Sequence, residues 1–390
     1  MPSDREQKPL RVVLTQPCLP RYRVPVYRAL AQRPGIDLTV VYGSEAGITN
    51  VEPDGFKGIF APLRDVSIRG SIIRFHRAQW DYASSARADV LILSWSTRYA
   101  TLLPALVRAN WNNVGTVLWG HGYSKAETTI RYRSRRALSD LADAVMFYNQ
   151  TAASEHVAAG GPSDRVFVAL NSLDQTETTT HRSAWLNDPA RLAAFRNEHK
   201  LHGPMLLFVS RLYAANKLEI LLEATAKLLP EFPDLTVAII GGGSEEASLR
   251  ALADKLGIAH AIRFLGTIYN EDELAPWFMC AQAFAYPANI GLSILHAFGH
   301  GLPVVTVAGH VAQAPEIDSL HDGFNGLTYP RGSVDGFADA LRRILRDPDL
   351  QRHLAANALI TATREFTLDR MVDGMESAVR FAALCRDSRG

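Results

Sequence analysis

The stretch ANIGLSILHAFGHGLPVV, Ala288–Val305, is the most informative part of the chain, because it joins a loop, a helix and a buried strand. The loop ends at Gly291-Leu292-Ser293, an apolar run at helical spacing follows, and Pro303-Val304-Val305 opens the strand. Ser293 is a candidate N-cap, which would direct backbone N–H groups toward the loop. A helix start of this kind binds anions such as a diphosphate, although an ordinary loop–helix–strand crossover has the same pattern.

On either side of this stretch, the chain repeats short apolar strands followed by amphipathic helices, which predicts parallel sheets covered on both faces. In the first half, we expect strands over Leu10–Thr15, Ile36–Tyr42, Val90–Ser94, Thr116–Trp119 and Ala144–Tyr148, and helices over Val24–Ala31, Tyr99–Ala109 and Ile130–Leu141. In the second half, we expect strands over Met205–Val209, Leu235–Ile240, Ile262–Leu265 and Ala283–Tyr286, and helices over Leu218–Leu229, Glu245–Leu256, Glu271–Met279, Val334–Arg346 and Leu350–Phe366.

A polar stretch, Asp174–Lys200, interrupts the alternation, although Pro189–Lys200 is a further helix candidate. A chain of 390 residues is too long for one ordinary core, so two domains are expected. We place an N-terminal Rossmann-like acceptor domain over residues 1–180 and a C-terminal Rossmann-like nucleotide-sugar domain over residues 181–368. A last helix within residues 369–390 is expected to pack back on the N-terminal domain. The predicted fold is α/β, with two doubly wound domains facing a cleft.

The composition excludes several classes of protein. A formal net charge of +1 gives no basis for nucleic-acid binding. The three cysteines are widely spaced and odd in number, which favours a reducing compartment over a disulfide framework or a metal cluster. The polar N-terminus has no apolar signal core, and we find no stretch long and apolar enough to span a membrane. The protein is therefore expected in the cytoplasm, with any membrane contact being peripheral.

Five segments, taken in order, resemble the retaining family-4-type glycosyltransferases of GT-B fold. They are FVSRLYAANKLEILLEA, AIIGGGSEEASLRALADKLGI, IRFLGTIYNEDEL, GLSILHAFGHGLPVV and APEIDSLHDGFNGLTYP. The resemblance covers Met205 to Leu345 well and the N-terminal half more loosely. It implies a nucleotide-diphosphate sugar bound mainly by the C-terminal domain, with no metal and no cofactor.

Arg211 and Lys217 stand where this family carries its paired basic residues. Cleavage of a sugar–phosphate bond leaves a nucleoside diphosphate with growing negative charge, which two fixed cations and a helix N-terminus can stabilise. The resemblance therefore implies a catalytic role for both side chains. A solvated arginine and lysine at a helix start would have the same sequence pattern.

The family usually carries two glutamates in an E-x7-E pattern, and here Ala288 and His296 occupy those positions. Ala288 cannot form a side-chain hydrogen bond, whereas His296 can still bind ribose hydroxyls. This branch either reads its donor differently or has lost activity. Glu316 matches a Pro-Glu element of the family, and the alternative for it is a helix N-terminal carboxylate.

The donor site is expected to include further backbone and side-chain groups. The resemblance places the nucleobase along Gly241, Gly242, Gly266 and Thr267, and the diphosphate at Gly291, Leu292 and Ser293. His296 and His300 are four residues apart on one helix, but the metalloprotease pattern needs a glutamate where Ala297 stands. We therefore predict no metal site.

Candidate residues in the N-terminal half follow two expected strands. Tyr22 and Arg23 lie in a proline-rich loop that lacks the family's glycines, and we assign them to acceptor binding or to an ordinary surface loop. His121 lies between two glycines after an expected strand, which would expose it to a cleft. The resemblance implies a catalytic role for His121 near the donor sugar, although a loop histidine without a chemical role has the same pattern. Lys125 and Glu127 are expected to share its cleft. The basic run 131–136 either meets anionic lipid head groups or is a solvated helix face.

The expected activity is transfer of a sugar from a nucleotide-diphosphate sugar to a saccharide or lipid-linked acceptor with retention of configuration. Surface polysaccharide or glycoconjugate biosynthesis at the inner face of the membrane is the expected setting. Two alternatives remain open. The loss of the glutamate pair favours a catalytically silent nucleotide-sugar-binding subunit, and the shared fold allows a nucleotide-sugar epimerase.

Overall fold

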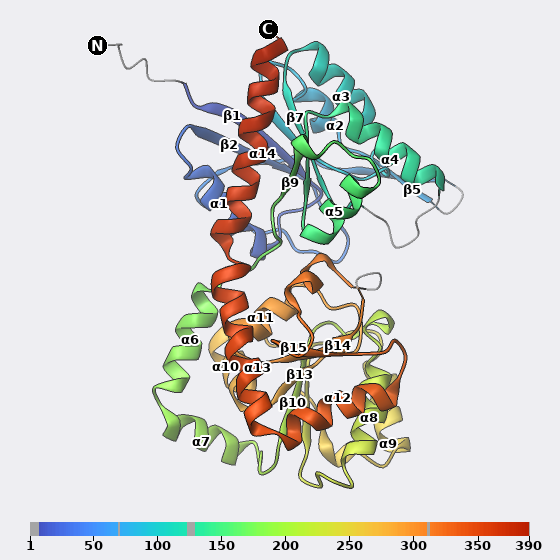
Figure 1. Ribbon diagram of the computed structural model, residues 1–390, viewed down its shortest axis with the longest axis vertical. Coiled ribbons are helices and arrows are strands. Elements are labelled where there is room, and N and C mark those ends of the chain that lie inside the picture. The colour runs from blue at the N-terminus through green and yellow to red at the C-terminus, as the bar shows by residue number, and fades with distance from the viewer. Residues whose placement is uncertain (1–7, 69–70, 123–128, 310–312, 390) are drawn as a thin grey trace. The chain divides into compact units, whose positions relative to one another are not determined.

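The computed structural model in Figure 1 describes residues 8–68, 71–122, 129–309 and 313–389. The chain divides into two compact units, the first made of Met1–Asn171 with Leu368–Gly390, and the second of Ser172–Thr367. The division after Asn171 precedes the expected boundary at residue 180. Helix α6 (Thr176–Leu186) accounts for this difference, because it packs against helix α10 (Glu271–Cys280) of the second unit.

The first unit contains a seven-stranded parallel sheet in the order β3-β2-β1-β6-β7-β8-β9. Its strands are β1 (Leu10–Gln16), β2 (Ile36–Tyr42), β3 (Lys57–Phe60), β6 (Val90–Ser94), β7 (Gly115–Gly120), β8 (Ala144–Phe147) and β9 (Val166–Val168). Strands β4 (Arg64–Ile68) and β5 (Ser71–Phe75) form a separate antiparallel hairpin. The helices are α1 (Val24–Ala31), α2 (Arg77–Asp81), α3 (Leu102–Trp111), α4 (Thr129–Leu141), α5 (Gln150–Ala158) and α14 (Leu368–Arg389).

Both faces of this sheet are buried, because successive side chains of a strand point to opposite faces. On β1, Val12 and Leu14 belong to the core that is shared with α1 and α14. Val13, between them, belongs to the core that is shared with α2 and α3. The continuous apolar runs in the sequence are therefore explained by burial on two sides.

Helix α14 covers one face of the first sheet, as the red helix in Figure 1 shows. Its side chains Met371, Met375, Val379 and Ala382 are fully buried in the first core. The helix therefore packs with the N-terminal sheet, although nearly two hundred residues of the second unit separate the two in sequence.

The second unit contains a six-stranded parallel sheet in the order β12-β11-β10-β13-β14-β15. Its strands are β10 (Met205–Val209), β11 (Thr236–Ile240), β12 (Ile262–Phe264), β13 (Ala283–Ala285), β14 (Val304–Val307) and β15 (Gly326–Tyr329). Besides α6 and α10, its helices are α7 (Pro189–Glu198), α8 (Leu218–Leu228), α9 (Glu246–Lys255), α11 (Ser293–Gly299), α12 (Val334–Arg346) and α13 (Pro348–Ile360). This is the Rossmann strand order, so two doubly wound sheets are confirmed.

Two local predictions were wrong. The helix expected over Leu350–Phe366 ends at Ile360 and continues as a π-helical turn, Thr361–Glu365. Ser293 is the first residue of α11 and not its N-cap, because the preceding Leu292 has φ −53° and ψ −20° and occupies the cap position without a side-chain hydrogen bond.

A buried histidine gives the first unit a predicted pH dependence. His76 is 1% exposed, and neither of its ring nitrogens has a hydrogen-bond partner among the described residues. Burial, together with the smaller effect of the positive charge of Arg74, lowers the pKa of His76 to about 4. Protonation therefore favours the unfolded chain, where the pKa of histidine is about 6.5. We expect stability to be lost as the pH falls from about 6.5 to about 4, by up to ~1.4 kcal/mol per pH unit.

Replacing His76 with leucine should flatten this dependence, measured as the free energy of unfolding in urea between pH 4 and pH 7. The substitution His202→Leu, at an exposed histidine, serves as the control and should leave the slope unchanged. An unchanged slope in His76→Leu would contradict the assignment.

Candidate active site

The order of strands in the second sheet reverses between β10 and β13, which are neighbours in the sheet. Ligands of open α/β sheets bind at the carboxyl ends of the strands at such a switch point. Two loops leave the sheet there, the 210–217 loop after β10 and the 286–292 loop after β13. The first carries Arg211 and Lys217, and the second leads through Gly291 and Leu292 to Ser293. The topology therefore places five of the predicted residues around one point of the sheet.

Asn216 joins the two loops. Its side-chain nitrogen donates to the carbonyl oxygen of Arg211 at 2.7 Å, and its side-chain oxygen accepts from Nδ2 of Asn289 at 3.1 Å. Asn216 is 3% exposed, so both bonds are shielded from water. The sequence analysis did not identify this residue, since an asparagine in a loop has no distinctive pattern. Asn216 therefore sets the position of the Arg211 backbone relative to the 286–292 loop.

Substituting Asn216 with aspartate should weaken this link, because a carboxylate oxygen cannot donate to the Arg211 carbonyl. Loss of one buried hydrogen bond costs about 1–3 kcal/mol. We expect a lower melting temperature and weaker binding of the donor nucleotide, measured by calorimetry. A matched control is Asn187→Asp, at an exposed residue beyond the end of α6. Unchanged nucleotide affinity in Asn216→Asp would show that the link does not shape the site.

The two cations at this point are exposed on the surface of the second unit. Nη1 of Arg211 is 3.3 Å from the hydroxyl of Tyr213, and the guanidinium lies 5.1 Å from the centroid of that ring. Nζ of Lys217 is 3.3 Å from Oε1 of Glu219, and the lysine side chain is 52% exposed. Lys217 has left-handed backbone, with φ 56°, at the start of α8. Both side chains are therefore held near the loop and remain accessible to an anionic ligand.

Tyr286 connects these cations to the start of α11. Burial raises the pKa of its phenol, while hydrogen bonds with the Ser210 and Ser293 side chains and the positive charge of Arg211 oppose the shift. The phenol thus lies between the 210–217 loop and Ser293. Ser293 belongs to the site through this contact and not through the predicted N-cap.

The glycine run after β11 packs against the 210–217 loop. A Cβ on Gly241 would lie 1.9 Å from the carbonyl oxygen of Ser210, and one on Gly243 would lie 2.3 Å from that of Leu212. The N–H of Leu212 in turn donates to the carbonyl of Gly242 at 3.0 Å. Both glycines are required by the close approach of the two chains, so the tight-turn explanation of the run holds structurally.

Gly266 and Thr267 lie next to the glycine run. The N–H of Gly241 donates to the carbonyl of Gly266 at 2.7 Å, and a Cβ on Gly242 would be 3.3 Å from Oγ1 of Thr267. The structure therefore brings together the four residues predicted to meet the nucleobase. Their contact with a base stays a prediction.

The segment after β14 is attached to the 286–292 loop by two hydrogen bonds to the backbone of Ile290. The N–H of Ala314 donates to the carbonyl of Ile290 at 3.0 Å, and Oε1 of Gln313 accepts from the N–H of Ile290 at 2.7 Å. Glu316, which is 3% exposed, follows in the 3₁₀ turn Pro315–Ser319. Glu316 is therefore a buried carboxylate close in sequence to residues that contact the predicted diphosphate loop.

His296 makes a contact that its sequence position did not reveal. Its Nε2 lies 2.8 Å from Oε1 of Glu271, and Nε2 of His300 lies 2.8 Å from the same oxygen. Burial alone would raise the pKa of Glu271, but hydrogen bonds with the two histidines and their charges hold it well below its usual range. For His300, burial lowers the pKa to about 4, against the opposing bond to Glu271. Ribose binding by His296 stays a prediction. Its Nδ1 would make that contact, because Nε2 faces Glu271.

In the first unit, Arg23 and His121 both contact Tyr148, and Arg23 also contacts Tyr22. The guanidinium carbon of Arg23 is 5.1–5.3 Å from the ring centroids of Tyr22, Trp119 and Tyr148, and the His121 ring centroid is 4.7 Å from that of Tyr148. Arg23 is 9% exposed, so it is not an ordinary surface-loop residue. Tyr148 directly follows strand β8, and it was not predicted as a site residue.

The other candidates of the first unit are only partly described. Lys125 and Glu127 lie outside the described residues. In the basic run 131–136, Arg135 is 6% exposed and donates to the carbonyl of Gly122 at 2.9 Å. Arg136 contacts the carbonyls of Ala159 and Gly160. These two arginines are thus engaged within the first unit, and the run is not simply a solvated face.

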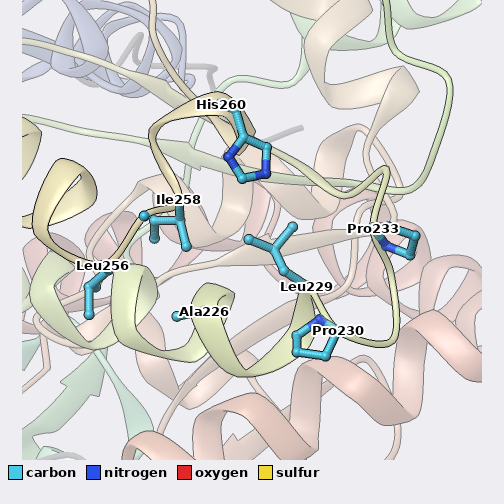
Figure 2. A pocket seen from close by; sticks show the side chains of 8 residues that line it. Ala226, Leu229, Pro230, Pro233, Leu256, Ile258 and His260 are labelled. Atoms are coloured by element: carbon cyan, nitrogen blue, oxygen red, sulfur yellow. The ribbon is translucent and has the colours of Figure 1, made fainter.

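A depression on the second unit, shown in Figure 2, has a different character. It is lined by Ala226, Leu229, Pro230, Pro233, Leu256, Gly257, Ile258 and His260. His260 is its only ionisable lining residue, and the pocket includes none of the predicted site residues. It lacks the convergent polar groups expected of a nucleotide site.

Within the part of the chain that the structure describes, no helix has the length and apolar character needed to cross a bilayer.

Comparison with known proteins identifies related sequences. Residues 203–347 match the family model described as Glycosyl transferases group 1. A GDP-mannose-dependent alpha-(1-6)-phosphatidylinositol monomannoside mannosyltransferase of Mycolicibacterium smegmatis is 29% identical over 281 residues, which are 69% of this chain and 69% of that protein. A D-inositol 3-phosphate glycosyltransferase of Frankia alni is 36% identical over 170 residues, and the match spans 40% of each chain.

Solved structures share the architecture. The crystal structure of Anabaena Alr3699/HepE in complex with UDP has a TM-score of 0.70, covering 96% of this chain and 100% of that chain at 16% identity. At this identity the likeness shows the fold alone. Together with the two Rossmann-like sheets, the comparisons show the GT-B fold and support a GT-B glycosyltransferase, with residues 203–347 as its Glycosyl transferases group 1 domain.

Proposed function

We propose that this protein transfers a sugar from a nucleotide-diphosphate sugar to a saccharide or lipid-linked acceptor with retention of anomeric configuration. The observation that carries the proposal is the pair of loops at the switch point of the second sheet. They present Arg211 and Lys217 beside the 286–292 loop, to which the Arg211 backbone is linked by Asn216. An exposed pair of cations at the carboxyl edge of a Rossmann sheet suits a diphosphate.

In this proposal, the bond between the anomeric carbon and the diphosphate oxygen breaks, and its electron pair leaves with the nucleoside diphosphate. Arg211 and Lys217 stabilise the negative charge that develops on this leaving group. The acceptor hydroxyl forms the new glycosidic bond and passes its proton to the departing diphosphate oxygen, which has taken the electron pair of the broken bond. The residues named here need no resident metal or cofactor for these roles.

The acceptor is assigned to the first unit, where Arg23 contacts both Tyr22 and Tyr148, and His121 packs on Tyr148. Aromatic faces and a guanidinium suit the hydroxyls, apolar faces and phosphates of saccharide or lipid-linked acceptors. The mannosyltransferase and D-inositol 3-phosphate glycosyltransferase relatives support this substrate class. We place the protein in the cytoplasm, at the inner face of the membrane, in surface polysaccharide or glycoconjugate biosynthesis.

The donor is identified first, by thermal shift with a panel of GDP- and UDP-sugars, because a ligand that prefers the folded state raises its melting temperature. The stabilising donor is then incubated with saccharide and lipid-linked acceptors, and the anomeric configuration of the product is read by NMR. The proposal requires release of nucleoside diphosphate and a product with the donor's configuration. An inverted product would contradict retention.

A silent nucleotide-sugar-binding subunit is the second candidate. It is favoured by the two positions at which the family carries glutamates, because Ala288 and His296 supply no carboxylate there. His296 is in addition hydrogen-bonded to Glu271. This candidate predicts a donor-induced thermal shift without nucleotide release under any acceptor. Epimerisation of the donor in the absence of acceptor would instead favour the epimerase alternative.

A further inference from the structure

Three metal-ligating side chains of the second unit, Glu271, His296 and His300, converge on one point. Glu271 is the first residue of α10, and its position is set by Asn270, whose side chain caps the helix by accepting from the N–H of Asp272. His296 lies on α11, and His300 is the residue that caps the end of that helix. One ligand atom from each of the three residues lies within 4.8 Å of the other two.

The contacts are directed at a single carboxylate. Nε2 of each histidine is 2.8 Å from Oε1 of Glu271, and Nε2 of His296 is also 3.1 Å from Oε2. Phe278 packs on both imidazoles, with ring centroids 4.7 Å from His296 and 4.5 Å from His300. The phenyl ring therefore restricts both imidazoles to orientations in which their Nε2 atoms face the same carboxylate.

We propose that Glu271, His296 and His300 bind a divalent transition-metal ion, with Zn²⁺ as the expected occupant. Two imidazole nitrogens and one carboxylate form a common zinc ligand set, and two histidines four apart on a helix share one face. Zinc bonds of about 2.0–2.1 Å in a tetrahedral site separate neighbouring ligand atoms by about 3.3 Å. The 2.8 Å contacts would therefore open by about half an ångström when the ion enters, a shift within reach of side-chain rotation.

Burial supports a structural ion over a surface contaminant. The side chain of His300 is fully buried, while those of Glu271 and His296 are 14% and 17% exposed. Water therefore reaches the cluster only from the side of Glu271 and His296, which leaves an entry path and a fourth coordination position. An ion here would join α10 to α11, the helix that begins at Ser293. The inference concerns the second unit alone and does not depend on the proposed sugar transfer.

The pattern H-x3-H could not reveal this set, because the third ligand, Glu271, precedes His296 by 25 residues and His300 by 29. Judged only by the residue after His296, the sequence predicted no metal. The glutamate of the contiguous motif is a general base, whereas here the fold brings Glu271 to the two histidines as the third ligand.

The experiment measures metal content and affinity in the full chain. Protein purified without chelator is analysed for zinc by plasma mass spectrometry. It is then stripped with chelator and titrated with Zn²⁺ against a chromophoric competitor, and with Co²⁺ to record its ligand-field absorption. We expect one ion per chain, a tetrahedral Co²⁺ spectrum, and a higher melting temperature on adding Zn²⁺ to the stripped protein.

Two variants test the ligands. Glu271→Gln and His296→Gln should each weaken zinc binding by more than ~10–100-fold. A loss of ~10–100-fold is typical when the altered residue contacts a metal ligand and not the metal itself, so a lost ligand should cost more. His181→Gln is the matched control, because His181 lies on α6, 3.5 Å from Asp272, and is outside the ligand set. This control should bind zinc as the unaltered chain does.

Absence of stoichiometric zinc together with a Co²⁺ spectrum lacking tetrahedral bands would overturn the proposal and leave a hydrogen-bonded clamp between the helices. Unchanged affinity in both ligand variants, or equal loss in His181→Gln, would overturn it as well. The Co²⁺ spectrum of the unaltered protein decides the matter even where a variant fails to fold.

Discussion

Replacing Lys217 with alanine is expected to lower kcat by ~10²-fold or more, the scale of losing one preorganised charge stabiliser. Lys217 ends the loop that leaves β10 at the switch point of the second sheet, and its side chain is 52% exposed beside Glu219. If its charge acts mainly on the departing diphosphate, the loss falls on kcat more than on the KM of the donor. Steady-state kinetics with the donor identified by thermal shift provides the measurement.

Lys227→Ala is the matched control for this prediction. Lys227 lies on the same helix, α8, is 49% exposed, and pairs with Asp335 at 2.7 Å. The Lys227→Ala variant therefore loses a comparable surface ion pair that is distant from the 210–217 loop. Its kcat should stay near that of the unaltered enzyme. Lys217→Arg should retain part of the activity because it keeps the charge. Equal kcat for Lys217→Ala and the unaltered enzyme would remove Lys217 from the reaction.

The substitution Gly241→Ala is expected to destabilise the second unit by about 3 kcal/mol or more, combining backbone strain with overpacking. Gly241 has φ 136°, and a Cβ there would lie 1.9 Å from the carbonyl oxygen of Ser210. The Cβ would be fixed to the Gly241 backbone and the carbonyl belongs to the Ser210 backbone, so one of the two loops must move. We expect a fall in melting temperature of about 10 °C and loss of donor binding, because the displaced loop carries Arg211.

Two glycines separate the causes of this effect. Gly257→Ala adds a Cβ at φ +72° with nothing within 4 Å, so it reports the strain of left-handed backbone alone. Gly242→Ala lies in the same run, where the added Cβ meets only Oγ1 of Thr267 at 3.3 Å. Both should cost much less than Gly241→Ala in a thermal melt. Comparable losses in the three variants would show that close packing against Ser210 is not the cause.

Much of the fold could be predicted from the sequence because the central strands are buried on both faces. Ile36–Tyr42, Val90–Ser94 and Met205–Val209 match the predicted bounds residue for residue. Val90–Leu93 and Met205–Val209 are continuous apolar runs, and Ile36–Tyr42 is interrupted only by Asp37 and Thr39. The missed strands β3 and β9 lie at the edges of the first sheet and are only partly buried. Strand β3 carries Lys57 and Gly58, and β9 is only three residues long, so neither gives a long apolar signal.

Helix α6 was missed because its sequence, TETTTHRSAWL, has a low intrinsic preference for helix. Tertiary contacts stabilise it instead. Trp185 is 4% exposed, and the helix packs along α10. A stretch of threonines thus looks like a linker until the neighbouring helix is known.

The candidate site shows the same division between local and long-range information. The loops that carry Arg211, Lys217 and Ser293 follow recognisable strands, so their placement at one edge of the sheet was foreseeable. Asn216 and Glu271 act through partners that are distant in sequence, Asn289 and His300 respectively. Tyr148 is likewise defined by Arg23, in the turn before α1, and by His121, just after β7. Only the fold shows these pairings.

Helix α14 has a consequence for how the polypeptide matures on the ribosome. The second unit is continuous in sequence, so all of its strands have been synthesised before α14 is translated. The first unit comes earlier in the message, yet the part of its sheet that packs against α14 stays uncovered until Met371, Met375, Val379 and Ala382 emerge. Folding is therefore expected to finish against the direction of translation, with apolar surface of the nascent N-terminal half exposed in the interval.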